Sequence, residues 1–201
     1  LISGIGQGYF QTSPLQICLM TAQLANGGYK IKPHIVNDEE KLEPIIAAWK
    51  QEHINLNKNS GLVEGEITFD GIYEKSSLVK LYRNKENVKF ILEALYGATN
   101  EPMGTSYKSR HVKPEYMFAG KTGTSQIKSI SAEARELKLK NKDLPYEDRD
   151  HALFTAYAPY KLPRYAFTVV IEHGGSGSSA AAPIAKKLIK KVLDRHKLRK
   201  K

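Results

Sequence analysis

Apolar residues follow two different periods along this chain, and each period predicts a different kind of element. Between positions 12 and 28 they recur every three or four residues, as on one face of an amphipathic helix. Thr12 or Ser13 can cap this helix, Pro14 suits its first turn, and the glycines at 27–28 can end it. We expect a core helix here, with an apolar face made of Leu15, Cys18, Leu19, Ala22 and Ala25.

The helical period returns twice more. Asn84 or Asn87 can cap a second helix, and Gly97 or Asn100 would end it. Its apolar face consists of Val88, Ile91, Leu92, Leu95 and Tyr96. A third helix is predicted after a glycine-rich bend at 174–177. Its expected cap is Ser178 or Ser179, and its expected apolar face is Leu188, Ile189, Val192 and Leu193.

Runs of β-branched and aromatic residues predict two strands late in the chain, at 151–157 and 165–172. A turn at 159–163 would join them as a hairpin, and we expect the hairpin to lie beside a strand at 117–126. The other stretches have weaker patterns. They are an extended segment at 29–36 that leads out of the first helix, a mixed surface region at 37–86 and a charged insertion at 127–150. The core of this insertion, at 131–140, is a good exposed helix former.

Size and composition indicate a globular chain of one domain or two closely packed subdomains, with 201 residues that are 41% hydrophobic. The single cysteine, Cys18, excludes an internal disulfide and a multi-cysteine zinc site. No run approaches the roughly 18 apolar residues of a membrane span, and no signal segment opens the chain. Because the first residue is Leu1 rather than Met, we expect a piece of a longer protein.

The formal net charge is +10, and much of it lies in residues 186–201. Basic chains attract nucleic acid, anionic lipid or anionic polymer, so a basic binding module is one hypothesis. The other is that these lysines form the solvated face of the last helix. We favour the helix and expect no nucleic-acid partner, because the basic run lacks the interleaved aromatic residues that stack on bases.

Neither the glycine-rich stretches nor the histidines predict a cofactor or metal site. Residues 4–8 do not match the dinucleotide fingerprint, and residues 174–177 lack the Gly-Lys-[Ser/Thr] of a phosphate loop. The histidines show no paired spacing, so we expect each to be a surface or capping residue rather than a ligand. They are His34, His53, His111, His151, His173 and His196.

The candidate chemistry lies in the strand at 117–126, around Lys121. In a strand alternate residues share a face, so Thr122 and Thr124 point the same way and their hydroxyls can converge on a carboxylate. The Lys121 stem is long enough to bring a positive charge alongside. Gly123 lets another backbone approach closely, so a peptide could dock as an added strand. Alone, Lys-Thr-Gly is a weak signal, and an edge strand running into a turn is the competing interpretation.

Several segments occur in an order that resembles the C-terminal half of the class B penicillin-binding proteins. They include Gly-Ile-Gly-Gln-Gly at 4–8, Gly-Thr at 104–105, Lys-Thr-Gly-Thr-Ser-Gln at 121–126, Ala-Tyr-Ala-Pro-Tyr at 156–160 and Glu-His-Gly-Gly at 172–175. The last two resemble the elongation enzymes more than their division counterparts. The likeness covers nearly the whole chain.

This resemblance implies an α+β fold class, namely part of the penicilloyl-serine transferase (transpeptidase/β-lactamase-like) fold, with an antiparallel sheet flanked by helices. The whole chain, 1–201, would be the C-terminal part of a transpeptidase domain. Within it, residues 1–36 would be a loop and helix, 37–86 the mixed surface region, and 87–201 the active-site strand, the hairpin and the C-terminal helix.

The implied activity is that of a serine-type peptidoglycan D,D-transpeptidase, which uses no cofactor. In this family a serine attacks the penultimate D-Ala carbonyl of a stem peptide, releases D-Ala and passes the acyl group to a neighbouring amine. β-Lactams mimic the D-Ala-D-Ala end. The parent would be anchored in the bacterial inner membrane, with this part in the periplasm beside a SEDS-family glycan polymerase. A D-alanine carboxypeptidase or a β-lactamase is the alternative within the superfamily.

By position, the resemblance assigns Lys121 to polarising the site and Thr122 and Thr124 to holding the terminal carboxylate. The backbone N–H of Thr124 would be one of the two oxyanion donors. Gly123 would give clearance for the substrate.

The family's serine motif and second motif lie upstream of the Lys-Thr-Gly strand, and we expect both to lie outside this chain. The Ser-x-x-Lys strings at 77–80 and 125–128 are not credible replacements, because such a pair must lie one helical turn apart at the start of a buried helix. The string at 82–84 mimics a variant of the second motif but lies too close to the first string. We therefore expect that a β-lactam does not acylate this chain alone.

Overall fold

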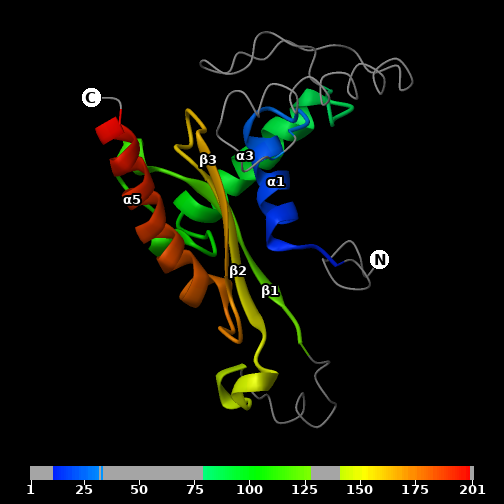
Figure 1. The fold of residues 1–201 in the computed structure, drawn as a ribbon, viewed down its shortest axis with the longest axis vertical. Coiled ribbons are helices and arrows are strands. Elements are labelled where there is room, and N and C mark those ends of the chain that lie inside the picture. The colour runs from blue at the N-terminus through cyan, green and yellow to red at the C-terminus, as the bar shows by residue number, and fades with distance from the viewer. Residues whose placement is uncertain (1–10, 32, 34–78, 128–140, 200–201) are drawn as a thin grey trace, which may run out of the picture. The chain divides into compact units, whose positions relative to one another are not determined.

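The computed structural model describes residues 11–31, 33, 79–127 and 141–199 (Figure 1). The chain divides into two compact units. We call Leu1–Ala22 with Leu92–Lys201 the sheet unit, and Gln23–Ile91 the second unit. Among the described residues, no helix is both long enough and apolar enough to span a membrane.

A three-stranded antiparallel sheet forms the centre of the sheet unit, with the strand order β1-β2-β3. The strands are β1 (Ala119–Ser125), β2 (His151–Ala158) and β3 (Tyr165–Ile171). The predicted hairpin and the predicted Lys-Thr-Gly strand are both confirmed. Strands β2 and β3 are rich in residues that pack well on a pleated surface. Strand β1 has few such residues, and its pairing with β2 along all 7 residues holds it extended.

Helix α5 (Ala182–Arg199) covers one face of the sheet and follows a π-helical turn, η6 (Gly177–Ala181). The predicted cap at Ser178 or Ser179 is wrong, because the helical turns begin at Gly177, with Ser176 as N-cap. Small side chains on both elements allow the helix to pack closely on the sheet. The buried cluster between them contains Phe118, Ala152, Phe154, Ala156, Ala158, Val169, Ala181, Ala182, Ala185, Ile189 and Leu193.

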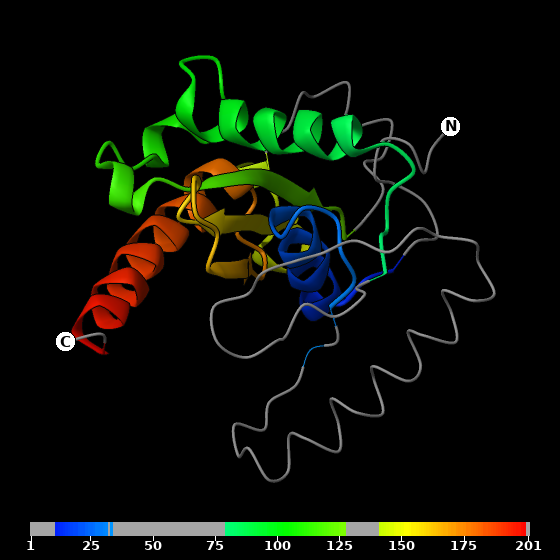
Figure 2. The same cartoon turned by 90° about the horizontal axis from the view of Figure 1, so that it is seen from above.

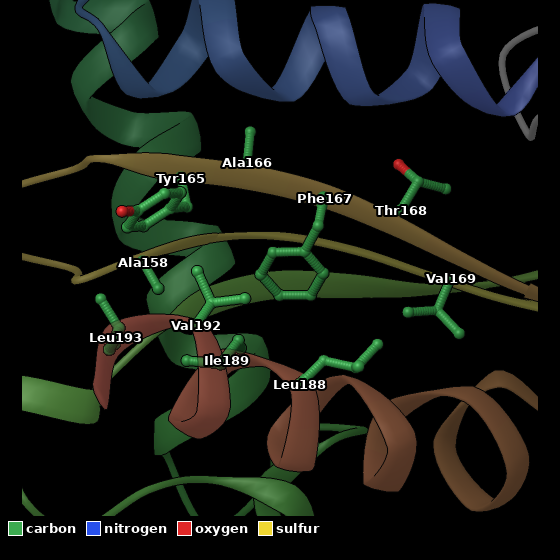
Figure 3. A pocket seen from close by; sticks show the side chains of 10 residues that line it. All are labelled: Ala158, Tyr165, Ala166, Phe167, Thr168, Val169, Leu188, Ile189, Val192 and Leu193. Carbon is green, nitrogen blue, oxygen red and sulfur yellow. The ribbon is translucent and has the colours of Figure 1, made fainter. Parts of the chain in front are cut away.

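An apolar groove of about 220 Å³ lies between β3 and α5 (Figure 3). Figure 3 shows Phe167 of β3 pointing across this groove toward the helix. The predicted inner face of α5 is confirmed at Ile189 and Leu193, which are buried. Leu188 and Val192 remain 47% and 38% exposed along the groove. No residue of the candidate site lines this groove.

Helix α1 (Pro14–Ala25) lies against the other face of the sheet, opposite α5 (Figure 1). Thr21 of α1 is buried, and its hydroxyl oxygen lies 2.7 Å from that of Thr155 on β2. The prediction of a core helix fails at Leu15, which is 63% exposed. The buried residue of α1 is therefore polar, and the other residues of the predicted apolar face, Cys18, Leu19, Ala22 and Ala25, are only half-buried.

The caps of the first two helices lie where the sequence predicted them. Ser13 and Gln16 form a reciprocal capping box, in which Ser13 N–H donates to Gln16 Oε1 at 2.7 Å and Gln16 N–H donates to Ser13 Oγ at 3.3 Å. Asn84 caps α3 (Lys85–Asn100) by accepting the N–H of Glu86 at 2.9 Å. Of the two predicted ends of α3, the structure confirms Asn100.

The described part of the second unit is small. Tyr29 forms an isolated antiparallel bridge with Lys80, so the predicted extended exit from α1 begins as expected. The rings of Tyr29 and Tyr82 meet edge to face at 5.9 Å. Most of the predicted surface region at 37–86 lies outside the described residues, and so does the predicted helix at 131–140.

The four histidines of the described residues, His111, His151, His173 and His196, are half-buried and hydrogen-bonded, whereas each was expected to be a surface or capping residue. The rings of His151 and His173 lie 4.9 Å apart, and the backbone N–H of His173 donates to His151 Nδ1 at 3.0 Å. His196 Nδ1 lies 2.6 Å from the Tyr165 hydroxyl. Short 3₁₀ turns make up the remaining described elements: η2 (Tyr107–Ser109), η3 (Pro114–Tyr116), η4 (Asn141–Asp143) and η5 (Tyr146–Asp148).

Candidate active site

Strand β1 is an edge strand among the described residues, and the end of α3 closes part of its outer edge (Figure 2). Thr99 is fully buried, and its Oγ1 accepts the N–H of Gly120 and donates to the Gly120 carbonyl, each at 3.1 Å. In an antiparallel sheet, both backbone groups of every second residue point to the same edge. The backbone groups of Thr122 and Thr124 therefore point outward on the same edge as those of Gly120.

The Lys121 side chain begins on the sheet face opposite to that of Thr122. Lys121 pairs with Thr155, whose hydroxyl contacts α1, whereas Thr122 pairs with Phe154 in the cluster under α5. The Lys121 ammonium reaches the strand edge, where Nζ lies 3.0 Å from the Thr122 carbonyl oxygen and 3.4 Å from Thr122 Oγ1. A positive charge thus lies beside an outward-pointing carbonyl and a hydroxyl.

Thr105 is a further residue at this edge, and it was not among the predicted site residues. Its Oγ1 lies 3.2 Å from Thr122 Oγ1, and either hydroxyl could donate. The pair Gly104-Thr105 was visible in the sequence, but nothing in its pattern indicated that it would meet β1. Thr99 was missed for the same reason, because its contact with Gly120 depends on how α3 packs.

Gly123 and Thr124 are the remaining two of the predicted site residues. Thr124 is exposed and lies on the same strand face as Thr122. A Cβ atom at Gly123 would lie 3.3 Å from Leu153 Cβ. A Cβ atom at Gly177 would lie 2.7 Å from the Gly123 carbonyl oxygen. The backbone at Gly123 is therefore closely packed against η6 as well as being part of the candidate edge.

The structure gives other roles to two residues of the motif look-alikes, Ser125 and Asn84. Ser125 is the last residue of β1, so it does not start a helix. Ser77 lies outside the described residues. Asn84 caps α3. Within the described part of these strings, no serine and lysine therefore lie on one helical turn.

Shifted pKa values mark no nucleophile in the part of the chain that the structure describes. Burial raises the pKa of the Cys18 thiol, which keeps it protonated and a poor nucleophile at neutral pH. Burial, and then the charge of Tyr160, raise the pKa of Tyr157. Within the same residues, no group of three or more His, Cys, Asp or Glu side chains could hold a metal ion.

Comparison with solved structures shows the same fold. The penicillin-binding protein PBP2 of Helicobacter pylori, solved in complex with MreC, is similar with a TM-score of 0.64 and 26% identity over 96% of this chain and 27% of that one. PBP2 of Pseudomonas aeruginosa, in complex with WCK 5153, has a TM-score of 0.60 and 29% identity over 94% of this chain and 32% of that one. The α+β class with an antiparallel sheet is thus confirmed.

Sequence comparison agrees. The chain is 32% identical over 192 residues to the peptidoglycan D,D-transpeptidase MrdA of Salmonella typhimurium, covering 95% of this chain and 26% of that protein. It is 33% identical over 188 residues to MrdA of Haemophilus influenzae, covering 92% of this chain and 24% of that protein. The chain thus spans about a quarter of the length of these relatives. The penicillin-binding protein transpeptidase domain matches residues 1–190, and the chain belongs to this family.

Proposed function

We propose that this chain supplies the carboxylate-binding strand of a peptidoglycan D,D-transpeptidase. The outer edge of β1 carries the proposal. There the Lys121 ammonium lies 3.4 Å from the Thr122 hydroxyl, and the backbone N–H of Thr124 points outward. A cation, hydroxyls and an outward-pointing N–H within one short segment complement the C-terminus of a peptide. The similarity to two MrdA proteins favours a transpeptidase over a carboxypeptidase or a β-lactamase.

The proposed substrate is a stem peptide that ends in D-Ala-D-Ala. Its terminal carboxylate binds Lys121 and the hydroxyls of Thr122 and Thr124, while its penultimate carbonyl oxygen accepts the N–H of Thr124. A serine outside this chain attacks that carbonyl carbon. The new C–O bond forms as the carbonyl π electrons move to the oxygen, which becomes an oxyanion. When the carbonyl re-forms, the C–N bond to the last D-Ala breaks, and the serine proton passes to the leaving amine. The N–H of Thr124 stabilises the oxyanion, a contribution of about 10²- to 10³-fold for one such donor.

The acyl-serine then reacts with an amine of a neighbouring stem peptide. The new amide bond forms the cross-link, and the serine recovers its proton from the attacking amine. A β-lactam that presents a carboxylate beside a strained amide would occupy the same edge. Gly123 keeps the strand narrow, so either ligand can lie flat against the backbone.

The same reasoning gives the proposed setting of the protein. Peptidoglycan lies outside the bacterial inner membrane, so this chain would act in the periplasm, as part of a membrane-anchored protein. A SEDS-family glycan polymerase is the proposed partner, because cross-linking needs freshly polymerised glycan. The complex of the Helicobacter pylori relative with MreC makes an MreC-like protein a second candidate partner.

Labelling with a fluorescent penicillin tests the proposal in the protein as its gene encodes it. Lys121→Met should slow covalent labelling by about ten- to a hundredfold, because a charge-assisted hydrogen bond to the carboxylate contributes roughly 1.5–3 kcal/mol. The control is Lys113→Met, which removes an exposed lysine that precedes η3 and lies outside β1, and it should label at the wild-type rate.

Two results would contradict the proposal. If the wild-type protein as its gene encodes it stays unlabelled, the chain does not serve a penicillin-reactive transpeptidase. If the 201-residue chain alone acquires a covalent adduct on a serine, the nucleophile is not outside the chain.

A further inference from the structure

The turn after α3 holds Thr105 against β1. Ser106 is bonded twice to the Ala98 carbonyl oxygen, by its N–H at 3.0 Å and by its hydroxyl at 2.9 Å. On the other side of Thr105, Gly104 packs so closely that a Cβ atom there would lie 2.5 Å from the same carbonyl oxygen. Both neighbours of Thr105 are thus fixed to the end of α3. Its exposed hydroxyl meets Thr122 Oγ1 at 3.2 Å.

The hydrogen bonds around Thr122 determine where its hydroxyl proton can go. A threonine hydroxyl has one proton and two lone pairs, and an ammonium group can only donate. The Lys121 ammonium, at 3.4 Å, therefore uses one lone pair of Thr122 Oγ1. If Thr105 donates its proton to Thr122 Oγ1, the second lone pair is used as well. The proton of Thr122 must then point elsewhere, and the open side of the edge is where an anion would bind.

We propose that Thr105 is a positioning residue that turns the Thr122 hydroxyl proton toward the terminal carboxylate of the ligand. The inference rests on the proposed function of the β1 edge. Thr105 acts through Thr122 and does not itself contact the carboxylate. In the opposite arrangement, Thr122 donates its proton to Thr105 and presents a lone pair to the anion, which is repulsive. An anionic ligand therefore favours the arrangement in which Thr105 donates to Thr122.

This role predicts an effect that depends on the charge of the ligand. Valine at position 105 keeps the shape of threonine but cannot donate a hydrogen bond, so the Thr122 proton is no longer directed outward. This loss should slow the reaction only of ligands that accept the Thr122 proton strongly. An uncharged ester at the same position accepts more weakly than a carboxylate. A merely structural role of Thr105 would affect both ligands alike.

The test compares benzylpenicillin with its methyl ester on the protein as its gene encodes it, and follows acylation by intact-protein mass spectrometry. Thr105→Val should slow acylation by benzylpenicillin about three- to tenfold, the range for one net hydrogen bond, and should change acylation by the ester less than about twofold. Thr105→Ser keeps the hydroxyl and should restore the wild-type rate. In a Thr122→Val background, Thr105→Val should have no further effect.

The outcomes separate this inference from the proposed function. If the wild-type protein reacts with benzylpenicillin but Thr105→Val slows the acid and the ester equally, or slows neither, the positioning role is overturned and the proposed function stands. The positioning role is also overturned if the two valine substitutions have additive effects. If the wild-type protein does not react with benzylpenicillin, the proposed function fails, and this inference fails with it.

Discussion

Replacing Thr99 with valine should weaken the connection between α3 and β1 while keeping the shape of the side chain. Thr99 is 0% exposed, and its Oγ1 is bonded at 3.1 Å to both the N–H and the carbonyl oxygen of Gly120. Valine places a methyl group where this oxygen lies. Both backbone groups of Gly120, which is itself buried, would then lose their partner away from water.

The size of the effect follows from these two groups. A buried backbone group without a partner costs about 1–3 kcal/mol, so losing the partner of both groups should lower the free energy of unfolding by roughly 2–6 kcal/mol. Thr99→Ser is the matched control, because it keeps the hydroxyl and removes only one methyl group. Its cost should be about 1 kcal/mol. The difference between the two variants therefore measures the hydroxyl.

Two measurements check this prediction. Urea denaturation gives the free energy of unfolding of each variant, and amide hydrogen exchange reports the opening of Gly120 directly. The Gly120 amide should exchange about thirtyfold faster or more in Thr99→Val, which corresponds to about 2 kcal/mol. Equal destabilisation by valine and serine would refute the reasoning. Unchanged protection of the Gly120 amide in the valine variant would refute it as well.

Two further predictions concern the turn and the tyrosine pair. Gly104→Ala should cost about 1–3 kcal/mol by thermal unfolding, because the new Cβ would lie 2.5 Å from the Ala98 carbonyl oxygen. Gly123→Ala is its milder control, since its nearest contact would be 3.3 Å. The hydrogen bond to Tyr29 raises the pKa of Tyr82 to about 12, with lesser effects of burial and of the Tyr29 charge. The pKa of Tyr82 in the folded protein lies above the usual 10.0. The stability that its hydrogen bond to Tyr29 contributes is therefore present below pH 10 and is lost as the pH rises through about 12. Tyr29→Phe should therefore lower the pKa of Tyr82 toward 10.0 in an ultraviolet absorbance titration, and an unchanged titration would contradict this cause.

The elements that the sequence predicted well are those with local causes. Ser13, Pro14 and Asn84 act within one helical turn of their own helices, so their roles follow from nearest neighbours. The hairpin of β2 and β3 follows from its apolar runs and its proline-bounded turn. Strand β1 has no such apolar pattern, and only the Lys-Thr-Gly motif indicated it.

The features that the sequence did not predict depend on packing between distant segments. Thr99 and Gly120 are 21 positions apart and meet only because α3 ends beside β1. The start of the last helical segment is set by a similar contact, because a Cβ atom at Gly177 would lie 2.3 Å from the Leu153 carbonyl oxygen. That close approach needs glycine, and it moves the helix start ahead of the predicted cap at Ser178 or Ser179.

The end of α3 covers the first part of the β1 edge, and this limits which ligands the edge can bind. Asn100 Nδ2 donates to the Phe118 carbonyl oxygen at 2.9 Å, and Thr99 occupies both backbone groups of Gly120. Among the described residues, no strand pairs with this edge from Thr122 onward. An exposed edge usually risks pairing with another strand, and a lysine on the edge reduces that risk.

Lys121 combines this protection with recognition. Its ammonium already donates to the Thr122 carbonyl oxygen at 3.0 Å, so a long strand would have to displace the ammonium from this oxygen. Such a strand could still not pair with Gly120, whose backbone groups are bonded to Thr99. A peptide that ends in a carboxylate has neither problem, because it stops before Gly120 and its charge attracts the ammonium. On the proposed function, α3 therefore makes the edge selective for the end of a peptide, independently of the serine that would react with it.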